Sequence, residues 1–325
     1  MSKKKIKIGF IGAGSIGSLF GGYLAAIQSS KYNLEIFFFC RKAHAEAINA
    51  KGLKLEKTDG IQVNLGIKAY EKLDNSSVSS FDYLFLCTKT YDIEKAMVQY
   101  KNLIEKSNWL VILQNGIGNE DIVKKYCSED KIIRIVTSNG ALLKEPGYVV
   151  HTGIGFTNVG FPFMRRTEKN IIEAKSSINL LKDILDISGI KTTLSDDIIK
   201  DCWEKVFVNA GINPFGALTR LKNGLLLENE GIKEKMEEAV IEAVKVARLK
   251  NIKLSEKDYV ALMFDVAEKT YDNKNSMLQD ILKGKKTEVD FINGRIVKYA
   301  NELGIKVLVN EVLTYLIKGL EQSFS

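Results

Sequence analysis

Three polar side chains recur at four-residue spacing within an otherwise apolar stretch, residues 203–214 (WEKVFVNAGINP). They are Lys205, Asn209 and Asn213, and the pattern predicts a helix that ends just before Pro214. On a helix this spacing places all three on one narrow face. An amine can donate a proton, and amides can hydrogen-bond a ligand without adding charge. The stripe therefore fits one wall of a reaction site, although a solvated helix face would show the same pattern.

A second polar group lies in DNKNSMLQDILKGKKTEVDFINGRIV. Asn273 and Ser276 precede Met277 in a segment typical of a helix entry, and Glu288 comes twelve residues after Ser276, early in another predicted helix. The local pattern favours plain structural roles. Ser276 would be a helix N-cap, and Glu288 a first-turn acid stabilised by the helix dipole.

A glycine-rich turn follows the apolar run 6–11, and a small-residue helix and a second apolar run, 34–40, come after it. This strand, turn, helix and strand order is typical of dinucleotide binding. Gly12 permits the tight turn, Gly14 lets a pyrophosphate approach the helix N-terminus, and Gly17 lets the helix lie close to the strand. The predicted cofactor-binding residues of the turn are Gly12, Ala13, Gly14, Ser15, Ile16 and Gly17.

The residues around the second apolar run indicate which dinucleotide is bound. NAD enzymes commonly place an acid at the end of this strand, but Glu35 lies at its start. Arg41 follows the strand instead, and its guanidinium would pair with the 2′-phosphate of NADP. We therefore expect NADP(H) as the cofactor. The alternative is that Arg41 merely begins a solvated helix.

Two further polar residues follow predicted strands. Lys89 comes after the apolar run 81–87, and Asn115 after the run 109–113. Ligands of parallel sheets lie beyond the carboxyl ends of the strands, so both residues are candidates for ligand contacts. Asn115-Gly116 also fits an ordinary turn, and Lys89 a solvated lysine. Neither histidine is assigned to catalysis: His44 falls on a predicted surface helix, and His151 in a predicted hairpin.

Composition narrows the class of protein. The 325 residues exceed a typical single core and predict about two domains. The 47 basic and 40 acidic residues give a formal net charge of +7, and no basic block is interleaved with aromatic residues, so we expect no nucleic-acid partner. The four cysteines are far apart and show neither metal-ligand spacing nor a disulfide framework. We therefore expect no metal site and a reducing compartment.

The basic, apolar N-terminus could be mistaken for a signal peptide. However, Lys7 interrupts its apolar run and no convincing small-residue cleavage site follows. No apolar stretch reaches the length of a membrane span. We therefore expect a cytoplasmic protein with no membrane partner.

The elements that must position these residues change in character along the chain. Strands alternate with helices up to about Asp196, and residues 146–160 favour a hairpin or an antiparallel edge. Predicted helices then cover 197–213, 232–249, 255–269, 287–303 and 309–320. The sequence thus predicts an α/β protein with an N-terminal Rossmann-type doubly wound sheet followed by an all-helical C-terminal domain. We place an NADP-binding domain at 1–196 and a helical substrate-binding domain at 197–325, with the substrate in the cleft between them.

The chain resembles the ketopantoate reductase family, the NADPH-dependent 2-dehydropantoate 2-reductases of pantothenate and coenzyme A synthesis. The resemblance covers nearly the full length. Its motifs, in order, are GAGSIG, CTKTYD, LQNGIGNE, HTGIG, WEKVFVNAGINP and NSMLQDILKGKKTEVDFING. The first is shared with many enzymes, whereas the last two are specific to this family.

The resemblance implies a role for each matching residue. Lys205 would be the catalytic lysine, and Glu288 its acidic partner near the substrate hydroxyl groups. Asn209, Asn213, Asn273 and Ser276 match substrate-contacting positions, and Lys89 and Asn115 match positions near the cofactor and the reacting carbon. Asn223 matches another family asparagine through a weaker motif. The implied reaction is hydride transfer from NADPH to the C2 ketone of ketopantoate, with Lys205 supplying the proton.

Two alternatives stay open at this point. The chain would also fit an NADPH-dependent reductase of another branched 2-oxoacid, since the family includes paralogues with similar motifs. A non-catalytic NADPH-binding sensor is a third reading, and Lys205 and Glu288 argue against it because a sensor needs neither. An exposed apolar face on the terminal helices would support a homodimer.

Overall fold

Two compact units make up the computed structural model, which describes residues 3–71, 80–163 and 168–324. The first unit comprises Met1–Gln114 and Asn119–Ile198, and the second comprises Asn115–Gly118 and Ile199–Ser325. The second unit therefore takes a four-residue segment from the loop that follows a strand of the first. This segment includes Asn115, which the sequence had placed with the sheet.

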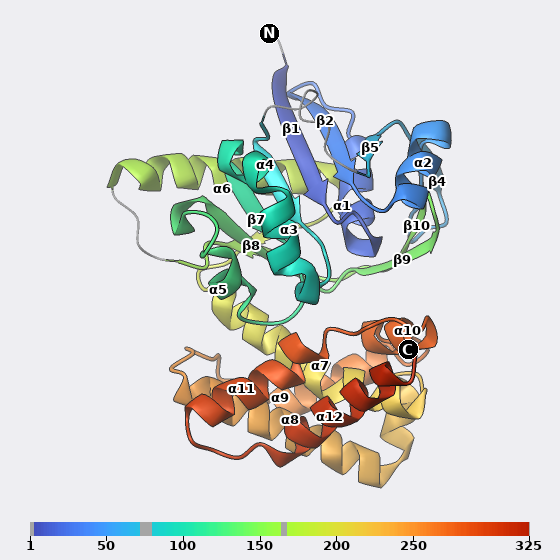
Figure 1. The fold of residues 1–325 in the computed structure, drawn as a ribbon, viewed down its shortest axis with the longest axis vertical. Coiled ribbons are helices and arrows are strands. Elements are labelled where there is room, and N and C mark those ends of the chain that lie inside the picture. Colours follow the sequence, from blue (N-terminus) through green and yellow to red (C-terminus); the bar gives the residue numbers. More distant parts are fainter. Residues whose placement is uncertain (1–2, 72–79, 164–167, 325) are drawn as a thin grey trace. The chain divides into compact units, whose positions relative to one another are not determined.

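An eight-stranded sheet forms the centre of the first unit, in the order β12-β11-β8-β7-β6-β1-β2-β5 (Figure 1). Its strands are β1 (Lys4–Ile11), β2 (Tyr32–Phe39), β5 (Lys68–Tyr70), β6 (Tyr83–Leu86), β7 (Trp109–Ile112), β8 (Ile132–Thr137), β11 (Thr157–Gly160) and β12 (Thr193–Leu194). The strands from β8 to β5 are parallel, and β11 pairs antiparallel to β8. The chain runs outward from β1 to β2 and returns on the other side of β1 at β6, which makes a topological switch point between β1 and β6. The predicted doubly wound sheet is confirmed.

A second, four-stranded sheet has the order β4-β3-β10-β9. Its strands are β3 (Leu53–Glu56), β4 (Gln62–Leu65), β9 (Gly140–Glu145) and β10 (Tyr148–Gly153). The sequence favoured a hairpin or an antiparallel edge at 146–160. The hairpin instead spans 140–153, as the antiparallel pair β9–β10 with its turn at Pro146 and Gly147, and β11 pairs antiparallel to β8 in the larger sheet. The sequence analysis missed β3 and β4, which are short and only partly buried.

Helices pack on these sheets around an aromatic core. They are α1 (Ser15–Ala25), α2 (Lys42–Lys51), α3 (Ile93–Gln99), α4 (Lys101–Lys106), α5 (Asn119–Val123) and α6 (Glu168–Ser188), with 3₁₀ turns η1 (Thr90–Asp92) and η2 (Glu129–Lys131). Phe10 stacks on Phe85 at 4.6 Å and meets Phe38 edge-on at 5.5 Å between ring centroids. All three rings are fully buried, so the core holds β1, β2 and β6 together at the edge where their loops begin.

From residue 199 onward the described elements are helical, as the sequence predicts. They are α7 (Ile198–Thr219), η3 (Gly224–Glu228), α8 (Glu230–Leu249), α9 (Tyr259–Lys269), α10 (Ser276–Leu282), η4 (Val289–Phe291), α11 (Asn293–Glu302) and α12 (Leu308–Gln322). The buried face of α7 carries Phe207, which packs edge-on against Tyr259 at 4.9 Å, and Trp203, which stacks on Tyr299 at 5.8 Å. Among the described residues, no helix combines the length and apolar character that a membrane span requires.

Candidate active site

The glycine-rich turn connects β1 to α1 with the tight geometry expected from its sequence. Gly12 has a φ of +75°, and a Cβ there would lie 2.5 Å from the Thr88 Cγ2 atom, so both the conformation and the space require glycine. A Cβ at Gly14, the N-cap of α1, would come no nearer than 3.8 Å to any described atom beyond its chain neighbours, the nearest being the Gly12 carbonyl oxygen. A Cβ at Gly17 would lie 3.1 Å from the Cys87 Cβ. The helix N-terminus is thus open to an anion at Gly14 and closely packed at Gly12 and Gly17.

Arg41 stands immediately beyond β2, at the N-cap of α2, and its side chain is exposed. The backbone N–H groups of Gly12 and Ala13 both donate to the Phe39 carbonyl, at 2.8 and 3.2 Å. The glycine turn and the end of β2 therefore lie together within the first unit. Glu35, the fourth of the eight residues of β2, pairs with Lys5 at 2.7 Å. A cation, not an acid, follows this strand.

The residues after β6 and β7 are joined at the carboxyl edge of the sheet. The Gln114 side-chain amide donates to the Thr88 carbonyl at 2.7 Å and to the Thr88 hydroxyl at 2.9 Å. The buried Arg134 guanidinium donates to the Gln114 carbonyl at 2.8 Å. Lys89 follows at the start of η1 and is partly exposed. These bonds fix the edge from which Lys89 extends.

Helix α7 does not end before Pro214, as the sequence led us to expect, but continues through it to Thr219. A proline inside a helix removes the N–H that would donate to the carbonyl four residues earlier, which here is Ala210. The Asn293 side-chain amide donates to that carbonyl at 3.2 Å and to the Asn310 side chain at 3.0 Å. Because Asn293 replaces the missing donor, the helix continues and its polar stripe stays regular.

Lys205, Asn115 and Glu288 form one hydrogen-bonded series within the second unit. The Lys205 ammonium donates to the Asn115 Oδ1 atom at 2.7 Å, and the Asn115 Nδ2 atom donates to a Glu288 carboxylate oxygen at 3.1 Å. Glu288 is 6% exposed. Asn209 and Asn213 follow Lys205 along the same face of α7, and Asn213 is buried. The structure therefore joins three residues that come from separate motifs.

Glu288 is not a first-turn helix acid. It precedes the short 3₁₀ turn η4, and α11 begins only at Asn293. The helix predicted from 287 is therefore interrupted at its start. Burial and the bond to Asn115 distinguish Glu288 from a solvated acid at a helix end, which would face water.

The segment 115–118 is seated on the residues that follow Glu288. The Ile117 N–H donates to the Phe291 carbonyl at 3.1 Å. Gly116 has a φ of +79°, and a Cβ there would lie 2.4 Å from the same oxygen. Only glycine permits this approach, so Gly116 has a specific backbone role in presenting Asn115.

The N-cap of α10 is Asn275, not Ser276. The Asn275 Oδ1 atom accepts from the Leu278 N–H at 2.9 Å, whereas Ser276 is the first helical residue and is exposed. The Asn275 amide also donates to the Asn223 side chain at 3.3 Å, and the Asn223 N–H donates to the Asn273 carbonyl at 3.0 Å. The sequence analysis missed Asn275, although an asparagine before a helix entry is a capping signal. Its bond to Asn223 links two of the candidate motifs.

Cysteines and histidines are poorly suited to nucleophilic or acid–base roles here. Burial raises the pKa of Cys40 to about 12 and that of Cys127 to about 11, and it also raises the pKa of Cys87. His44 is buried, not on the surface as expected, and burial lowers its pKa to about 4. His151 is buried between Tyr23 and Asn139, and burial lowers its pKa. No metal-binding group of three His, Cys, Asp or Glu residues occurs in the part of the chain that the structure describes.

Two family models match the chain. The model described as "Ketopantoate reductase PanE/ApbA" matches residues 8–162, and "Ketopantoate reductase PanE/ApbA C terminal" matches residues 197–321. Among curated relatives, the 2-dehydropantoate 2-reductase of Pyrococcus abyssi is 37% identical over 317 residues, which cover 97% of this chain and 98% of the relative.

Solved structures show the same relationship. A PanE/ApbA family ketopantoate reductase from Ralstonia eutropha has a TM-score of 0.85 at 29% identity, with 98% of this chain and 99% of that chain covered. D-mandelate dehydrogenase, solved with NADH and anilino(oxo)acetate, has a TM-score of 0.84 at 26% identity over the same shares of the two chains.

Proposed function

Because the chain belongs to the ketopantoate reductase family, we propose that it reduces 2-dehydropantoate to pantoate with NADPH. The hydrogen-bonded series from Lys205 through Asn115 to Glu288 is the observation that supports this most directly. Each of the three residues comes from a different family motif. A folded scaffold alone does not require an amine, an amide and a buried carboxylate that are linked to one another by hydrogen bonds.

The first unit supplies the proposed phosphate contacts of the cofactor. The GAGSIG turn would hold the pyrophosphate at the N-terminus of α1, and Arg41 would pair with the 2′-phosphate. Lys89 and Asn115 would contact the nicotinamide end. When bound, NADPH supplies the hydride that the reduction requires. The open space over Gly14 fits this group, since a pyrophosphate needs close approach to the backbone there.

The second unit supplies the proposed acid and the substrate contacts. As the C2 oxygen gains negative charge, the Lys205 ammonium stabilises it and then donates a proton to it. The Asn115 carbonyl oxygen accepts a hydrogen bond from the Lys205 ammonium and so fixes its position in the proposed site. Glu288 would accept a hydrogen bond from a substrate hydroxyl. Asn209, Asn213, Asn273 and Ser276 would orient the rest of the ketoacid.

A second candidate substrate class follows from the similarity to D-mandelate dehydrogenase, whose structure contains NADH. The same acid would serve any 2-oxoacid whose C2 oxygen reaches Lys205. Arg41 favours NADPH over NADH, because a guanidinium after β2 binds a 2′-phosphate better than free ribose hydroxyls.

The test is reduction of 2-oxoacids by the purified protein, followed at the nicotinamide absorbance band. We expect the highest kcat/KM with ketopantoate and NADPH. Benzoylformate, the 2-oxoacid of mandelate, and an unbranched 2-oxoacid are the comparison substrates. A higher kcat/KM with either comparison substrate would show that ketopantoate is not the preferred substrate. If the protein reduced none of the three 2-oxoacids, the proposed function would be contradicted.

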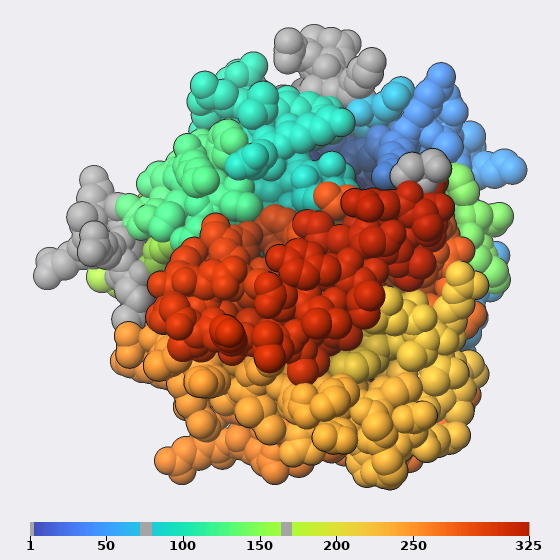
Figure 2. Space-filling model, turned by 60° about the horizontal axis from the view of Figure 1, so that its bottom comes forward, coloured from blue at the N-terminus to red at the C-terminus, as the bar shows by residue number. Residues whose placement is uncertain are grey.

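We further propose that the partner of this chain is a second copy, paired through α12. Leu308, Val312, Tyr315 and Leu316 form an apolar stripe on one face of this helix, and each is more than half exposed. The C-terminal helix lies on the surface of its unit, in dark red in Figure 2. An antiparallel two-fold pairing centred near Val312 would bury the same stripe on both copies. Light scattering should give the mass of a dimer, and a monomer at micromolar concentration would contradict the pairing.

A further inference from the structure

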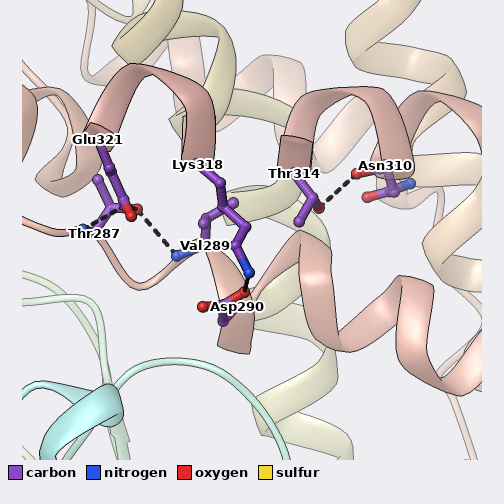
Figure 3. Close-up of polar contacts among 7 residues, drawn as sticks. All are labelled: Thr287, Val289, Asp290, Asn310, Thr314, Lys318 and Glu321. Atoms are coloured by element: carbon purple, nitrogen blue, oxygen red, sulfur yellow. Dashed lines mark hydrogen bonds and ion pairs between the residues drawn. The ribbon is translucent and has the colours of Figure 1, made fainter. Parts of the chain in front are cut away.

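The backbone on both sides of Glu288 is fixed by the inner face of the last helix, α12. Figure 3 shows this arrangement: Thr287 and Asp290 point toward Glu321 and Lys318. These four residues lie in the second unit together with Lys205 and Asn115. None of the four belongs to the sequence-predicted site.

The first attachment is at Thr287. The Glu321 Oε1 atom accepts two hydrogen bonds, from the Thr287 N–H at 2.7 Å and from the Thr287 hydroxyl at 2.6 Å. The hydroxyl oxygen in turn accepts from the Val289 N–H at 3.2 Å. Thr287 is 1% exposed. The Glu321 carboxylate is partly buried, and its contact with two donors of one residue fixes both the backbone and the side chain of Thr287.

The second attachment is at Asp290. The Lys318 ammonium donates to the Asp290 Oδ1 atom at 2.9 Å, one turn of α12 before Glu321. This pair is more exposed than the first and therefore contributes less. Together the two attachments hold the residues before and after Glu288, while the Phe291 carbonyl binds the loop that carries Asn115.

We propose that Glu321 is a positioning residue for the reductase reaction, acting through Thr287 on the orientation of Glu288. This inference rests on the proposed function, since it concerns the same site. The Glu288 carboxylate meets the Asn115 amide at 3.1 Å, and a small rotation of the backbone at Thr287 would move it out of hydrogen-bond range. Misplacement of a catalytic constellation by about 1 Å can cost on the order of a hundredfold in rate, even when the altered residue lies away from the chemistry.

Two pairs of variants test whether the contact between Glu321 and Thr287 positions Glu288. Glu321→Ala removes the acceptor, and Glu321→Gln keeps an Oε1 that can accept from both donors. Thr287→Val removes the hydroxyl at nearly constant shape, and Thr287→Ser restores it. We expect Glu321→Ala and Thr287→Val to lower kcat by roughly tenfold, as for loss of a charge-assisted hydrogen bond. Glu321→Gln and Thr287→Ser should recover most of that loss.

Two readouts separate positioning from general destabilisation. The Kd for NADPH, measured by fluorescence titration, should stay near the wild-type value in every variant, because the proposed contacts with the cofactor phosphates, at the glycine turn and Arg41, lie in the first unit. Amide hydrogen exchange at residues 287–291 should accelerate in Glu321→Ala, and Glu311→Ala, which changes another acid of α12, should alter neither exchange nor kcat. A wild-type kcat in Glu321→Ala, or equal losses in Glu321→Ala and Glu321→Gln, would overturn the proposal.

Failure of the proposed function would look different. In that case the wild-type protein would reduce none of the 2-oxoacids tested, and the positioning role would fall with it. The exchange measurement would still show whether Glu321 holds the segment. An active wild type with an unaffected Glu321→Ala variant overturns the positioning role alone.

Discussion

The side-chain amide of Asn293 donates to the carbonyl oxygen of Ala210, at 3.2 Å, in place of the N–H that Pro214 lacks. This bond joins the start of α11 to the middle of α7, between Asn209 and Asn213. Asn293 is fully buried, so no water can take its place at that carbonyl without rearrangement. The proline and the asparagine are therefore one structural device, although they are far apart in the sequence.

Asn293→Ala should destabilise the second unit because it leaves the Ala210 carbonyl and the Asn310 side chain short of a donor. We expect a loss of about 1–3 kcal/mol of unfolding free energy, the usual cost of an unsatisfied buried group. The partner variant is Pro214→Ala, which restores the helical N–H. In a double-mutant cycle by urea unfolding, Asn293→Ala should cost less in the Pro214→Ala background. Strictly additive effects would show that the two residues are independent.

Arg41→Ala should raise the KM for NADPH and leave that for NADH nearly unchanged. The guanidinium would bind the 2′-phosphate, which NADH lacks, and loss of a charge-assisted contact costs about 1.5–3 kcal/mol, or roughly ten- to a hundredfold. Steady-state kinetics with both cofactors give the comparison. Equal effects on the two would remove Arg41 from the phosphate site, and Lys42→Ala, one residue further along the exposed start of α2, serves as the control.

Asn275→Ala should affect stability and Ser276→Ala should affect substrate binding, because the helix cap is Asn275. Loss of the cap should lower stability by about 0.5–2 kcal/mol. Ser276→Ala should leave the melting temperature unchanged and raise the KM for the ketoacid, since a hydroxyl that only holds the substrate contributes similarly to ground and transition states. Wild-type kinetics for Ser276→Ala would exclude the substrate contact.

Acidification should destabilise the first unit through His44. Burial lowers its pKa from 6.5 to about 4, and its Nδ1 atom accepts from the Gly147 N–H at 2.9 Å, which a proton there would oppose. Between these two pH values the unfolded chain binds a proton that the native state refuses, so stability falls as the pH decreases. The effect approaches about 3 kcal/mol by pH 4. The stability difference between wild type and His44→Gln, measured by urea unfolding, should shrink by that amount from pH 7 to pH 4. A pH-independent difference would show that His44 does not titrate in this range.

Local residue types were sufficient to predict the parts of the fold that depend on neighbouring sequence. The glycine turn could be predicted because a tight turn between a strand and a helix requires glycine. Gly12 is required by its backbone angle and Gly17 by the closeness of the helix to the strand. The stripe of Lys205, Asn209 and Asn213 could be predicted from helical periodicity alone. The change from strands to helices near residue 197 was visible in the same way.

Contacts between distant segments could not be predicted from such patterns. Pro214 normally ends a helix, and the donor that lets α7 continue is supplied by Asn293, from another helix. The burial of His44 depends on Ser18 and Gly147, which local amphipathicity does not reveal. The strands β3 and β4 alternate in burial, but each has only four residues, and β3 pairs with β10, almost a hundred residues later in the chain. Likewise, the family resemblance identified Glu288 as a candidate site residue, but it did not predict the hydrogen bond between Glu321 and Thr287.

The kcat of Lys205→Ala with NADPH and ketopantoate tests the central claim most directly. A general acid typically contributes about 10² to 10⁴ in rate, so kcat should fall by that factor while the Kd for NADPH stays near the wild-type value. Lys200→Ala, which removes another lysine from the same helix, should keep wild-type kcat. A Lys205→Ala enzyme with near-normal kcat would contradict the account and return Lys205 to a solvated helix face.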